Sequence, residues 1–453
     1  MRAQIQLKYK EDGKGNGLIL PNEFEKYSIK TVAFGTLEYP VTVSYHARPF
    51  IYVDYELYEK LMLPFEGNVH YFIHNEAIHL GPLIGIFTAG FTSSMLRPIG
   101  ERSLFFSKLL STEKKVGAYA FIFGANHINW EDGTIEGFMF TDKGWCKKQL
   151  PFPHVVYDRL PNRRTEQHRL LKETREKMQK QYMIPWYNPG FFNKWEIHQK
   201  LSLEENLSDF LPETYNNLSI TLLEELLSKY PFLYLKPSSG SLGLGVFKII
   251  YNKEEGHYYC RYKDDEQKNR LQRFTSLEKM LGYVLKNKDI KNYIVQQGIP
   301  LIKVDDSTVD FRVHTNKDEN GMWHVSAIAG KLSGKGSVTT HANSGGVVRT
   351  VEEIFTDKEE VILIKKKLSH AALSLSEAID RHLPGFIGEI GFDFGIDNKE
   401  GNVWLFEANS KPGRAIFYHP KLRNEDYLTR RLSIEYAIYL TEKALENPEG
   451  IHL

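Results

Sequence analysis

Two carboxylates and one amide lie close together near the C-terminus of the chain. Asp393, Glu407 and Asn409 fall within Gly388–Gly413, GEIGFDFGIDNKEGNVWLFEANSKPG, which predicts two antiparallel strands joined by a turn at Asp397–Gly401. Because residues two apart on a strand face the same side, Glu407 and Asn409 can share one target. Oxygen donors of this kind suit Mg²⁺. Surface acids on a hairpin are the alternative, but Glu407 lies among apolar residues, where an unpaired carboxylate is costly, and this favours a metal site.

A lysine followed by a turn rich in Gly and Ser indicates a phosphate site. Phe232–Ile250 reads FLYLKPSSGSLGLGVFKII, a strand that ends at Lys236, a turn and a second strand. Glycine has no side chain in the way, so backbone N–H groups of such a turn can approach an anion. The turn comprises Ser238, Ser239, Gly240, Ser241, Gly243 and Gly245. It is neither a Walker pattern nor a Rossmann fingerprint. An ordinary flexible turn is the alternative, and Lys236 directly before it favours phosphate binding.

Two further segments lie between these motifs. Tyr293–Ile302, YIVQQGIPLI, predicts an apolar strand whose residues Gln296–Ile299 can present backbone groups to an adenine edge. It is followed by DFRV, in which Asp310 and Arg312 share one strand face. Arg312 can therefore neutralise the charge that develops on a phosphate during transfer.

The elements that position these residues change in type along the chain. Short runs of β-branched and aromatic residues in the first hundred residues predict a small β domain: Ile5–Tyr9, Tyr39–His46, Ile51–Val53 and Val69–Ile73. From about Leu83 to Asp158, strands alternate with a helix at Ser103–Leu110, as in a small α/β unit. Arg163–Met183 predicts one charged, amphipathic helix with a solvated face that links two domains. Helices and strands alternate again beyond it.

Composition excludes several classes of protein. The 453 residues carry 58 Lys and Arg against 57 Asp and Glu, so the bulk charge gives no reason to expect a nucleic-acid or membrane-surface partner. Cys146 and Cys260 are far apart and read as free thiols of a reducing compartment. The 16 histidines match no zinc spacing. Met1–Gly17 is polar and Leu80–Phe91 is broken by Gly and Pro, so we expect neither a secretion signal nor a membrane span, and a location in the cytoplasm.

The order of the motifs carries a resemblance to a known family. Lys194 at a helix start, Lys236 before the Gly-rich hairpin, the Gln296–Ile299 segment, DFRV, and Asp393, Glu407 and Asn409 followed by Lys-Pro-Gly resemble an ATP-grasp enzyme over about 185–418. The whole chain, including LGPLIGIFTAGF at Leu80–Phe91, is similar to the YheC/YheD family of endospore-coat-associated ATP-grasp proteins.

The resemblance implies a fold with α+β and α/β parts. It is an ATP-grasp fold, in which two α+β subdomains clasp ATP, preceded by a small α/β unit and an N-terminal β-rich domain. The implied boundaries are 1–82 for the β-rich domain, 83–184 for the α/β unit and 185–453 for the ATP-grasp domain, with a lid at about 212–296.

The resemblance also implies a role for each candidate residue. ATP would contact Lys194, Lys236, Ser238, Ser239, Gly240, Ser241, Gly243, Gln296, Gln297, Gly298, Ile299 and Lys331. Arg312, Lys236 and Arg349 would be catalytic, and Asp393, Glu407 and Asn409 would hold two Mg²⁺ ions, with Mn²⁺ as a substitute. His341, Asn343 and Arg414 would contact substrates, although a surface arginine explains Arg414 equally well. Lys303, Asp305 and Asp306 occupy the stretch where many members have an acid for the ribose.

Three functions fit these implications. The leading one is an ATP-dependent carboxylate–amine ligase that acts through an acyl phosphate on small-molecule or peptide substrates and is linked to the spore coat or to sporulation in the mother cell. A phosphotransferase that stops at phosphoryl transfer is the second. A non-catalytic, ATP-binding coat protein is the third, and the intact set of charged residues argues against it. Spore coat proteins are the macromolecular partners that the resemblance implies, with no nucleic acid and no membrane.

Overall fold

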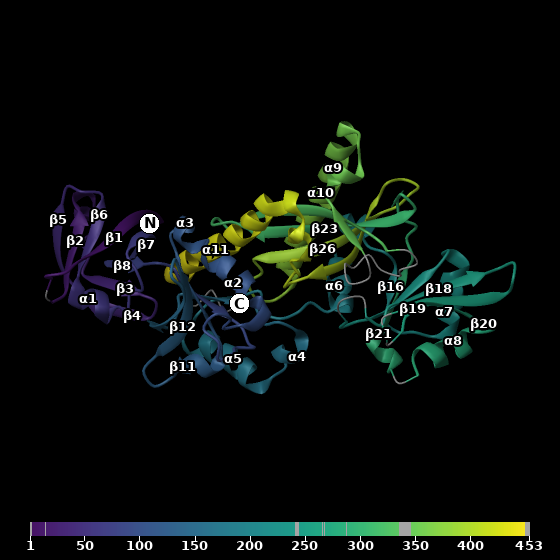
Figure 1. Ribbon diagram of the computed structural model, residues 1–453, viewed down its shortest axis with the longest axis horizontal. Helices are drawn as coiled ribbons and strands as arrows, with labels where there is room; N and C mark the ends of the chain where they lie inside the picture. The colour runs from purple at the N-terminus through teal and green to yellow at the C-terminus, as the bar shows by residue number, and fades with distance from the viewer. Residues whose placement is uncertain are drawn as a thin grey trace.

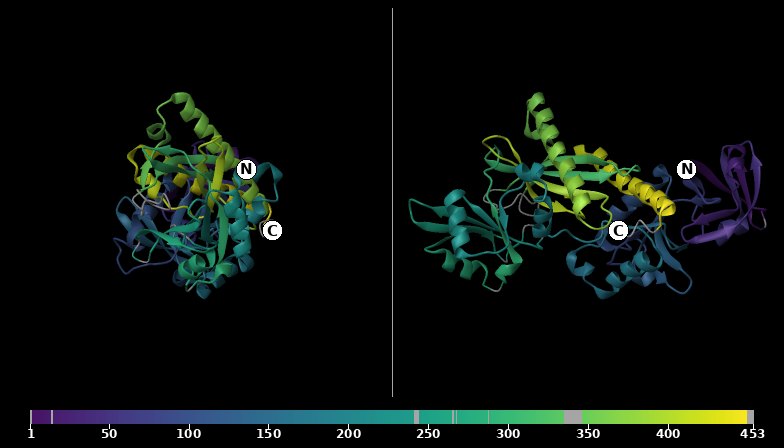
Figure 2. Two further views of the ribbon diagram at one scale, coloured as in Figure 1. Left: turned by 90° about the vertical axis from the view of Figure 1, so that its right-hand side faces the viewer. Right: turned by 180° about the vertical axis from the view of Figure 1, so that it is seen from behind.

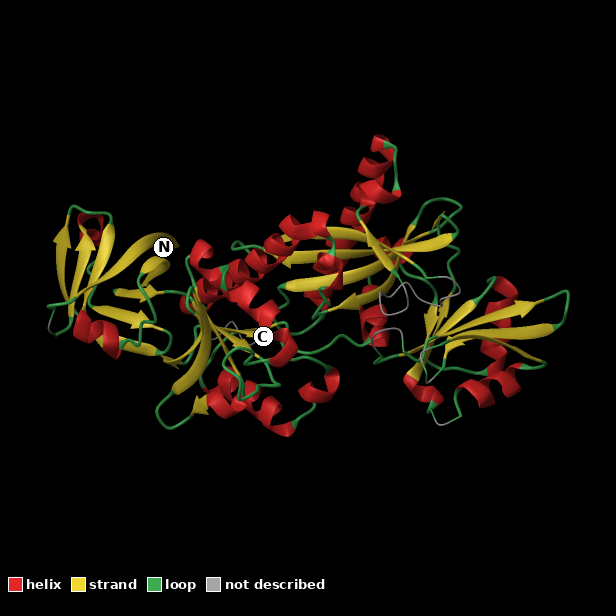
Figure 3. Ribbon diagram, viewed as in Figure 1, coloured by secondary structure: helices red, strands yellow, loops and turns green. Residues whose placement is uncertain are grey.

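The computed structural model describes residues 2–13, 15–240, 244–264, 266, 268–286, 288–334 and 346–448. The molecule is elongated, with the N-terminal strands at one end and the strands around residues 214–297 at the other (Figure 1). Its strands form four separate groups with helices between and around them (Figure 3). No helix within the described ranges is long and apolar enough to cross a membrane.

The first sheet has eight strands in the order β4-β3-β8-β7-β1-β6-β2-β5. Its strands are β1 (Arg2–Lys10), β2 (Gly17–Pro21), β3 (Thr31–Phe34), β4 (Leu37–Pro40), β5 (Thr42–His46), β6 (Phe50–Asp54), β7 (Gly67–His74) and β8 (Ala77–Leu80), with α1 at Tyr55–Lys60. Strand β1 alternates buried Ile5 and Leu7 with more exposed neighbours, which is the pattern of a sheet covered on one face.

The second sheet is parallel at its centre. It consists of β9 (Leu83–Phe87), β10 (Tyr119–Phe123), β11 (Ile128–Asn129), β12 (Thr134–Thr141), β13 (Gly144–Pro151), β14 (Val155–Asp158) and β15 (Trp186–Tyr187), with helices α2 (Ser103–Leu110), α3 (Glu113–Val116), α4 (Arg163–Glu166) and α5 (Arg169–Gln181). Strands β10, β9, β14 and β15 pair in parallel, and every residue of β9, β10 and β14 is buried, as expected for strands covered on both faces. One hydrophobic cluster runs from Leu7 and Val53 to Phe121 and Trp186, so the first two sheets share a core.

The third sheet, which we term the lid sheet, follows α6 (Lys194–Leu201). Its order is β16-β21-β17-β18-β19-β20, from β16 (Thr214–Tyr215), β17 (Leu233–Pro237), β18 (Phe247–Asn252), β19 (His257–Lys263), β20 (Asn269–Phe274) and β21 (Tyr293–Gln297). Helices α7 (Ile220–Lys229) and α8 (Leu277–Val284) pack on one face through Leu223, Leu227 and Met280. The other face carries the even-numbered residues of β17, including Lys236.

The fourth sheet, which we term the base sheet, has the order β25-β24-β23-β26-β27, with β22 pairing β23. Its elements are β22 (Lys303–Val304), β23 (Ser307–Lys317), β24 (Trp323–Leu332), β25 (Val347–Arg349), β26 (Glu389–Ile396) and β27 (Val403–Asn409), with α9 (Val351–Ile354) and α10 (Lys358–His382). Phe311 and Val313 of β23 pack against Leu368 and Leu375 of α10, so one face of the base sheet is a hydrophobic core.

The C-terminal helix α11 (Arg423–Glu446) packs against β23 and β24 of the base sheet and also against the second sheet (Figures 1 and 2). Ile434, Tyr436 and Ile438 share a hydrophobic cluster with Ile84 and Ile86 of β9. Part of the core of the α/β unit therefore comes from α11, which lies outside the expected boundaries 83–184 of that unit.

Sequence patterns and structure differ at the charged segment Arg163–Met183. Instead of one helix, the chain forms α4 and α5, with His168 extended between them at φ −65° and ψ 127°. Asn162 caps α4 by accepting from Thr165 N, and Arg163 donates to the carbonyl oxygens of Phe191 and Phe192. These contacts hold α4 as a separate helical turn that does not continue into α5.

A buried asparagine joins the second sheet to the base sheet. Asn188, 1% exposed, donates through Nδ2 to Glu389 O at 2.8 Å and to Ser410 O at 2.6 Å. Its Oδ1 accepts from Gly388 N at 2.9 Å and from Glu389 N at 3.2 Å. Next to it, the Arg159 guanidinium and the Tyr157 hydroxyl both donate to the Glu389 carboxylate. Strand β26, which carries Asp393, and the end of β27, which carries Glu407, are thereby fixed to the α/β unit.

We expect Asn188→Ala to lower the free energy of unfolding by roughly 3 kcal/mol or more, because it leaves buried backbone groups unpaired and puts alanine at a left-handed φ of 54°. Glycine tolerates that φ, but Asn188→Gly also removes the four hydrogen bonds, so it should lower the free energy of unfolding by most of the same amount. Urea unfolding followed by tryptophan fluorescence measures both. Wild-type stability of the glycine variant would show that the four hydrogen bonds do not stabilise the fold.

Candidate active site

One face of the base sheet gathers charged residues from four adjacent strands. In the register of the sheet, Lys331 of β24 lies opposite Asp310 of β23, Arg312 lies opposite Asp393 of β26, and Asp393 lies opposite Glu407 of β27. Directly paired residues point to the same face, and the odd-numbered residues of β23 already face α10. The charged row therefore lies on the face away from α10.

Asp393 is at the centre of an ion network. Arg312 binds it with two parallel bonds, Nε to Oδ1 at 2.9 Å and Nη2 to Oδ2 at 2.8 Å. Lys331 Nζ lies 2.7 Å from Asp393 Oδ1 and 3.0 Å from Asp310 Oδ1. Burial would raise the pKa of Asp393, but these two cations outweigh it and hold the pKa well below its usual range. Asp393 is thus a permanent carboxylate, and its charge is matched by its neighbours.

The three predicted metal ligands are brought together. Glu407 pairs with Asp393 across β26 and β27, and Asn409 pairs with Gly391, two residues along the same face. The set consists of two carboxylates and one amide. The described ranges contain no group of three His, Cys, Asp or Glu side chains that could hold a metal ion without such an amide. That donor set fits Mg²⁺, which completes its shell with water and phosphate oxygens.

Lys236 approaches this face from the lid sheet. Its ammonium donates to the Gln296 side-chain oxygen, and the Gln296 amide donates to Thr214 Oγ1 at 3.1 Å, so three lid strands fix its position. Burial, together with the nearby Lys194 ammonium, lowers the pKa of Lys236 to about 8, although Glu407 acts in the opposite direction. Keeping the buried Lys236 ammonium charged therefore costs free energy, and the negative charge of a bound polyphosphate would offset that cost.

Lys194 connects the Gly-rich turn with the carboxylates. Its Nζ donates to Gly240 O at 2.7 Å and lies 3.3 Å from Glu407 Oε1, and its backbone N donates to Ser238 O at 3.0 Å. Asn193, which caps α6, also donates to Ser239 Oγ at 3.2 Å. The predicted turn residues Ser238, Ser239 and Gly240 thus lie beside Lys194, whereas Ser241 and Gly243 fall outside the described residues.

A narrow cavity of about 30 Å³ lies between the lid sheet, the base sheet and α6. Lys194, Gln296 and Glu407 line it together with apolar side chains that include Ile294, Leu405 and Phe406. The sequence analysis did not predict these apolar residues as part of the site, although the large apolar residue Phe406 directly precedes Glu407. The cavity combines one ammonium group, that of Lys194, and one carboxylate, that of Glu407, with apolar side chains.

The hinge segment after β21 requires its glycine. A Cβ on Gly298 would lie 2.0 Å from Phe232 Cδ2 and 2.3 Å from Phe232 O, so only glycine fits without displacing backbone. Gln297 is held from both sides, because its N donates to Glu213 O and its Oε1 accepts from Glu213 N. Ile299, 5% exposed, completes the predicted segment.

The structure does not bring every predicted residue to this site. Arg349 lies opposite Gly330, not Lys331, in the β24–β25 register, so it is on the other face of the base sheet, and it is exposed. Arg414 donates to Asp426 Oδ1 at 2.7 Å and to Thr429 on α11, an internal contact. His341 and Asn343 lie outside the described part of the chain.

The candidates for the ribose position lie at the rim. Lys303 is exposed, and Asp305 and Asp306 form the β22–β23 turn at positive φ values of 49° and 62°. Asp310 lies deeper, 8% exposed, and its charge adds to burial in raising the pKa of Tyr234 to about 12. Asp310 is therefore close to Tyr234 of the lid sheet.

Comparison with known proteins identifies the family of this site. The model of the YheC/D-like ATP-grasp family matches residues 183–440. The chain is also 44% identical over 438 residues to endospore coat-associated protein YheD of Bacillus subtilis (strain 168), covering 96% of each chain. The chain belongs to the YheC/D-like ATP-grasp family. Its fold is therefore the ATP-grasp fold. Endospore coat-associated protein YheC of the same organism is 23% identical over 276 residues, covering 60% of this chain and 73% of YheC.

Solved structures show weaker likenesses. D-alanyl-alanine synthetase A from Vibrio cholerae superposes with a TM-score of 0.46 at 12% identity, covering 81% of this chain and 99% of that one. D-alanine–D-alanine ligase from Bacillus anthracis gives a TM-score of 0.45 at 13% identity, covering 80% and 98%.

We expect the affinity for Mg-ATP to fall with pH above about 8, approaching tenfold per pH unit. In the free protein the Lys236 ammonium loses its proton in that range, and polyphosphate binding requires the ammonium, so binding must take up a proton. Calorimetric titration from pH 7 to 9.5 measures this dependence, and Lys236→Arg should abolish it because the guanidinium stays charged.

Lys248 on the neighbouring strand β18 provides a matched control. Burial, with Arg261 and Lys303, lowers its pKa to about 8 as well. Lys248→Arg should retain the pH dependence. If the dependence persisted in Lys236→Arg and vanished in Lys248→Arg, the assignment of Lys236 to the phosphates would be wrong.

Proposed function

We propose that the protein is an ATP-dependent carboxylate–amine ligase that acts through an acyl phosphate. The observation that carries this proposal is that Lys194 and Glu407 meet at one cavity between lid and base, where the lining residue Gln296 accepts a hydrogen bond from Lys236. Membership in the ATP-grasp family supports it, because ligases are common among proteins of this fold.

The nucleotide would lie between the two sheets. The apolar side chains of Ile294 and Phe406 offer contact to a flat base. The N–H groups of Gln297 and Gly298 already donate to Glu213 O and Phe232 O, so the backbone of Ile299 would contact the edge of the base. The ammonium groups of Lys194 and Lys236 would bind the phosphates, beside the backbone of Ser238–Gly240. Lys331 contacts Asp310 and Asp393, which places it within the base rather than in the cavity lining.

Asp393, Glu407 and Asn409 would hold Mg²⁺, with Mn²⁺ as a substitute. When bound, the ion neutralises charge on the phosphates and aligns them for transfer. Glu407 is the ligand most available for this role, because it is 22% exposed and its contact to Lys194 is long at 3.3 Å. Asp393 would share its oxygens between the ion and Arg312.

Arg312 and Lys331 supply the remaining charge compensation. The substrate carboxylate attacks the γ-phosphorus, ADP leaves, and the amine then displaces phosphate from the acyl carbon to give an amide. Negative charge spreads over the transferring group in the first step, and cations held in place beforehand stabilise it without reorganisation. The bidentate bond to Asp393 keeps the Arg312 guanidinium in place.

The substrates proposed are a small-molecule or peptide acid and an amine. The 44% identical relative is named for its association with the endospore coat, which suggests that the product is a spore component and that coat proteins are partners. We place the reaction in the mother-cell cytoplasm, in keeping with the two free cysteines, Cys146 and Cys260.

Release of ADP and phosphate from Mg-ATP, with amino acids and peptides supplied singly and in pairs, tests the proposal. We expect release that requires an acid and an amine together. Release with one acceptor and no amine would make the protein a phosphotransferase. Tight ATP binding without release on any mixture would contradict the ligase and favour a nucleotide-binding coat protein.

Glu407→Gln should lower Mg-dependent turnover by roughly 10²- to 10³-fold with little loss of stability. The substitution keeps the shape of a partly exposed side chain, whereas removing Asp393 would leave the buried Arg312 without its carboxylate partner. Glu400→Gln, in the exposed turn of the same hairpin, is the matched control and should be silent. Normal turnover in Glu407→Gln would remove the metal assignment.

A further inference from the structure

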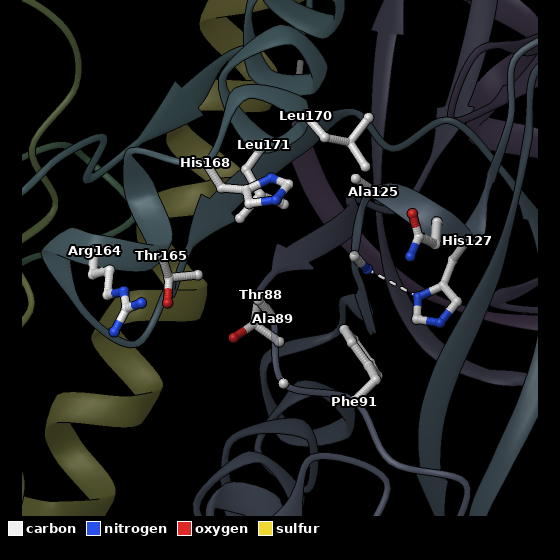
Figure 4. A pocket seen from close by; sticks show the side chains of 13 residues that line it. Thr88, Ala89, Phe91, Ala125, His127, Arg164, Thr165, His168, Leu170 and Leu171 are labelled. Atoms are coloured by element: carbon white, nitrogen blue, oxygen red, sulfur yellow. Dashed lines mark hydrogen bonds between the residues drawn. The ribbon is translucent and has the colours of Figure 1, made fainter.

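A second cavity, of about 530 Å³, lies in the α/β unit (Figure 4). The loop after β9, Thr88–Phe91, and the loop after β10, Gly124–His127, form one side of it. Arg164 and Thr165 of α4, His168, and Leu170 and Leu171 of α5 form the other side. None of the nucleotide-site residues lines it, so it is separate from the cleft between lid and base.

The topology makes this position suited to a ligand. Strand β9 is the centre of the parallel part of the sheet, with β10 on one side and β14 on the other. The loops that leave β9 and β10 therefore start at the carboxyl ends of parallel strands. The direction of the strand order reverses between β9 and β14, so the β9 loop borders this switch point. Ligands of open α/β sheets bind in the crevice at such points.

The charges of the cavity select an anion. Its lining contains Arg164 and the histidines His127 and His168, and no Asp or Glu. Burial lowers the pKa of His127, so Arg164 supplies the charge and His127 a neutral ring. Arg102 lies behind the β9 loop, donates to Thr88 Oγ1 at 2.9 Å and to Ala89 O, and has no carboxylate partner in the described ranges. The sign of the local field is therefore positive although the whole chain is nearly neutral.

Hydrogen-bond donors point to the same ligand class. His127 Nδ1 accepts from Gly124 N at 2.9 Å (Figure 4), so the ring carries its proton on Nε2 and His127 is a hydrogen-bond donor among the lining residues. The backbone N–H groups of Ala89, Gly90 and Ala125 donate to no acceptor among the residues that the structure places. Backbone donors in such loops commonly bind carboxylate or phosphate oxygens.

The rest of the wall is apolar. Phe91 packs against Phe138 with ring centroids 5.4 Å apart, and Leu170 and Leu171 face it across the cavity (Figure 4). Leu170 is 43% exposed in the present state, and a ligand would cover it. The volume falls in the range of ordinary small-molecule sites.

We propose that this cavity binds a small organic carboxylate with an apolar body, at the carboxyl ends of β9 and β10. Arg164, the His127 imidazole and the loop N–H groups bind the carboxylate, and Phe91, Leu170 and Leu171 contact the apolar body. The proposal does not rest on the ligase reaction, because the lining and its donors are independent of the nucleotide site.

Isothermal titration calorimetry of the 453-residue protein with 3-phenylpropionate and 4-methylpentanoate tests the proposal. The neutral analogue 3-phenylpropionamide is the control. We expect at least one carboxylate to bind in the millimolar range or tighter, and the amide roughly tenfold or more weakly, because it lacks the charge. Absence of binding by both carboxylates, or equal binding of the amide, would overturn the proposal.

Two variants locate the binding. Arg164→Gln removes an exposed charge from the wall and should weaken carboxylate binding roughly tenfold. Thr165→Phe places a ring in the cavity and should abolish binding. Lys180→Gln removes a charge from the exposed end of α5 and should bind as the wild type does. Circular dichroism checks that each variant is folded, and unchanged binding in both cavity variants would overturn the assignment.

Discussion

The buried carboxylate of Asp393, shared by Arg312 and Lys331, is the interaction on which the rest of the site depends. Each of these side chains is about a tenth exposed, so each charge pays for its removal from water and needs its partners. The pairing explains how one face of the base sheet can be charged while the other packs on α10. It also fixes the lateral positions of β23, β24 and β26, and hence the place at which Glu407 meets Lys194.

Two separate hydrophobic cores hold the two halves of the cleft. The lid core contains Leu223 and Met280, whereas the base core contains Phe311 and Leu368, and no residue belongs to both clusters. Polar contacts such as that between Lys194 and Gly240 cross between them. Contacts of this kind exchange readily for a ligand's oxygens, whereas the seam around Asn188 ties the base rigidly to the α/β unit.

The sequence predicted those parts of the site that depend on local spacing. Glu407 and Asn409 share a face because they are two apart on a strand, and Ser103–Leu110 is a helix with the predicted bounds. Arg349 was placed by its position in the chain, but its face depends on the β24–β25 register, which spacing does not determine. Arg414 has a partner on α11 that only the folded chain brings near.

Features built from distant segments were beyond sequence reasoning. The break at His168 follows from tertiary contacts of Arg163, since the local pattern of the segment favours one helix. The shared core of the first two sheets joins Leu7 with Trp186, and the cluster of α11 with β9 joins Ile84 with Ile434. The cavity at the ends of β9 and β10 combines three segments, none of which carries a recognisable motif.

Electron paramagnetic resonance of Mn²⁺ titrated into the protein with and without ATP tests the central claim most directly, because it reports whether metal and nucleotide occupy the same cleft. We expect Mn²⁺ to bind tightly only in the presence of ATP, and this ternary binding to be lost in Glu407→Gln and retained in Glu400→Gln. Ternary binding of full strength in Glu407→Gln would contradict the account of the site between Lys194, Lys236 and the carboxylates of the base sheet.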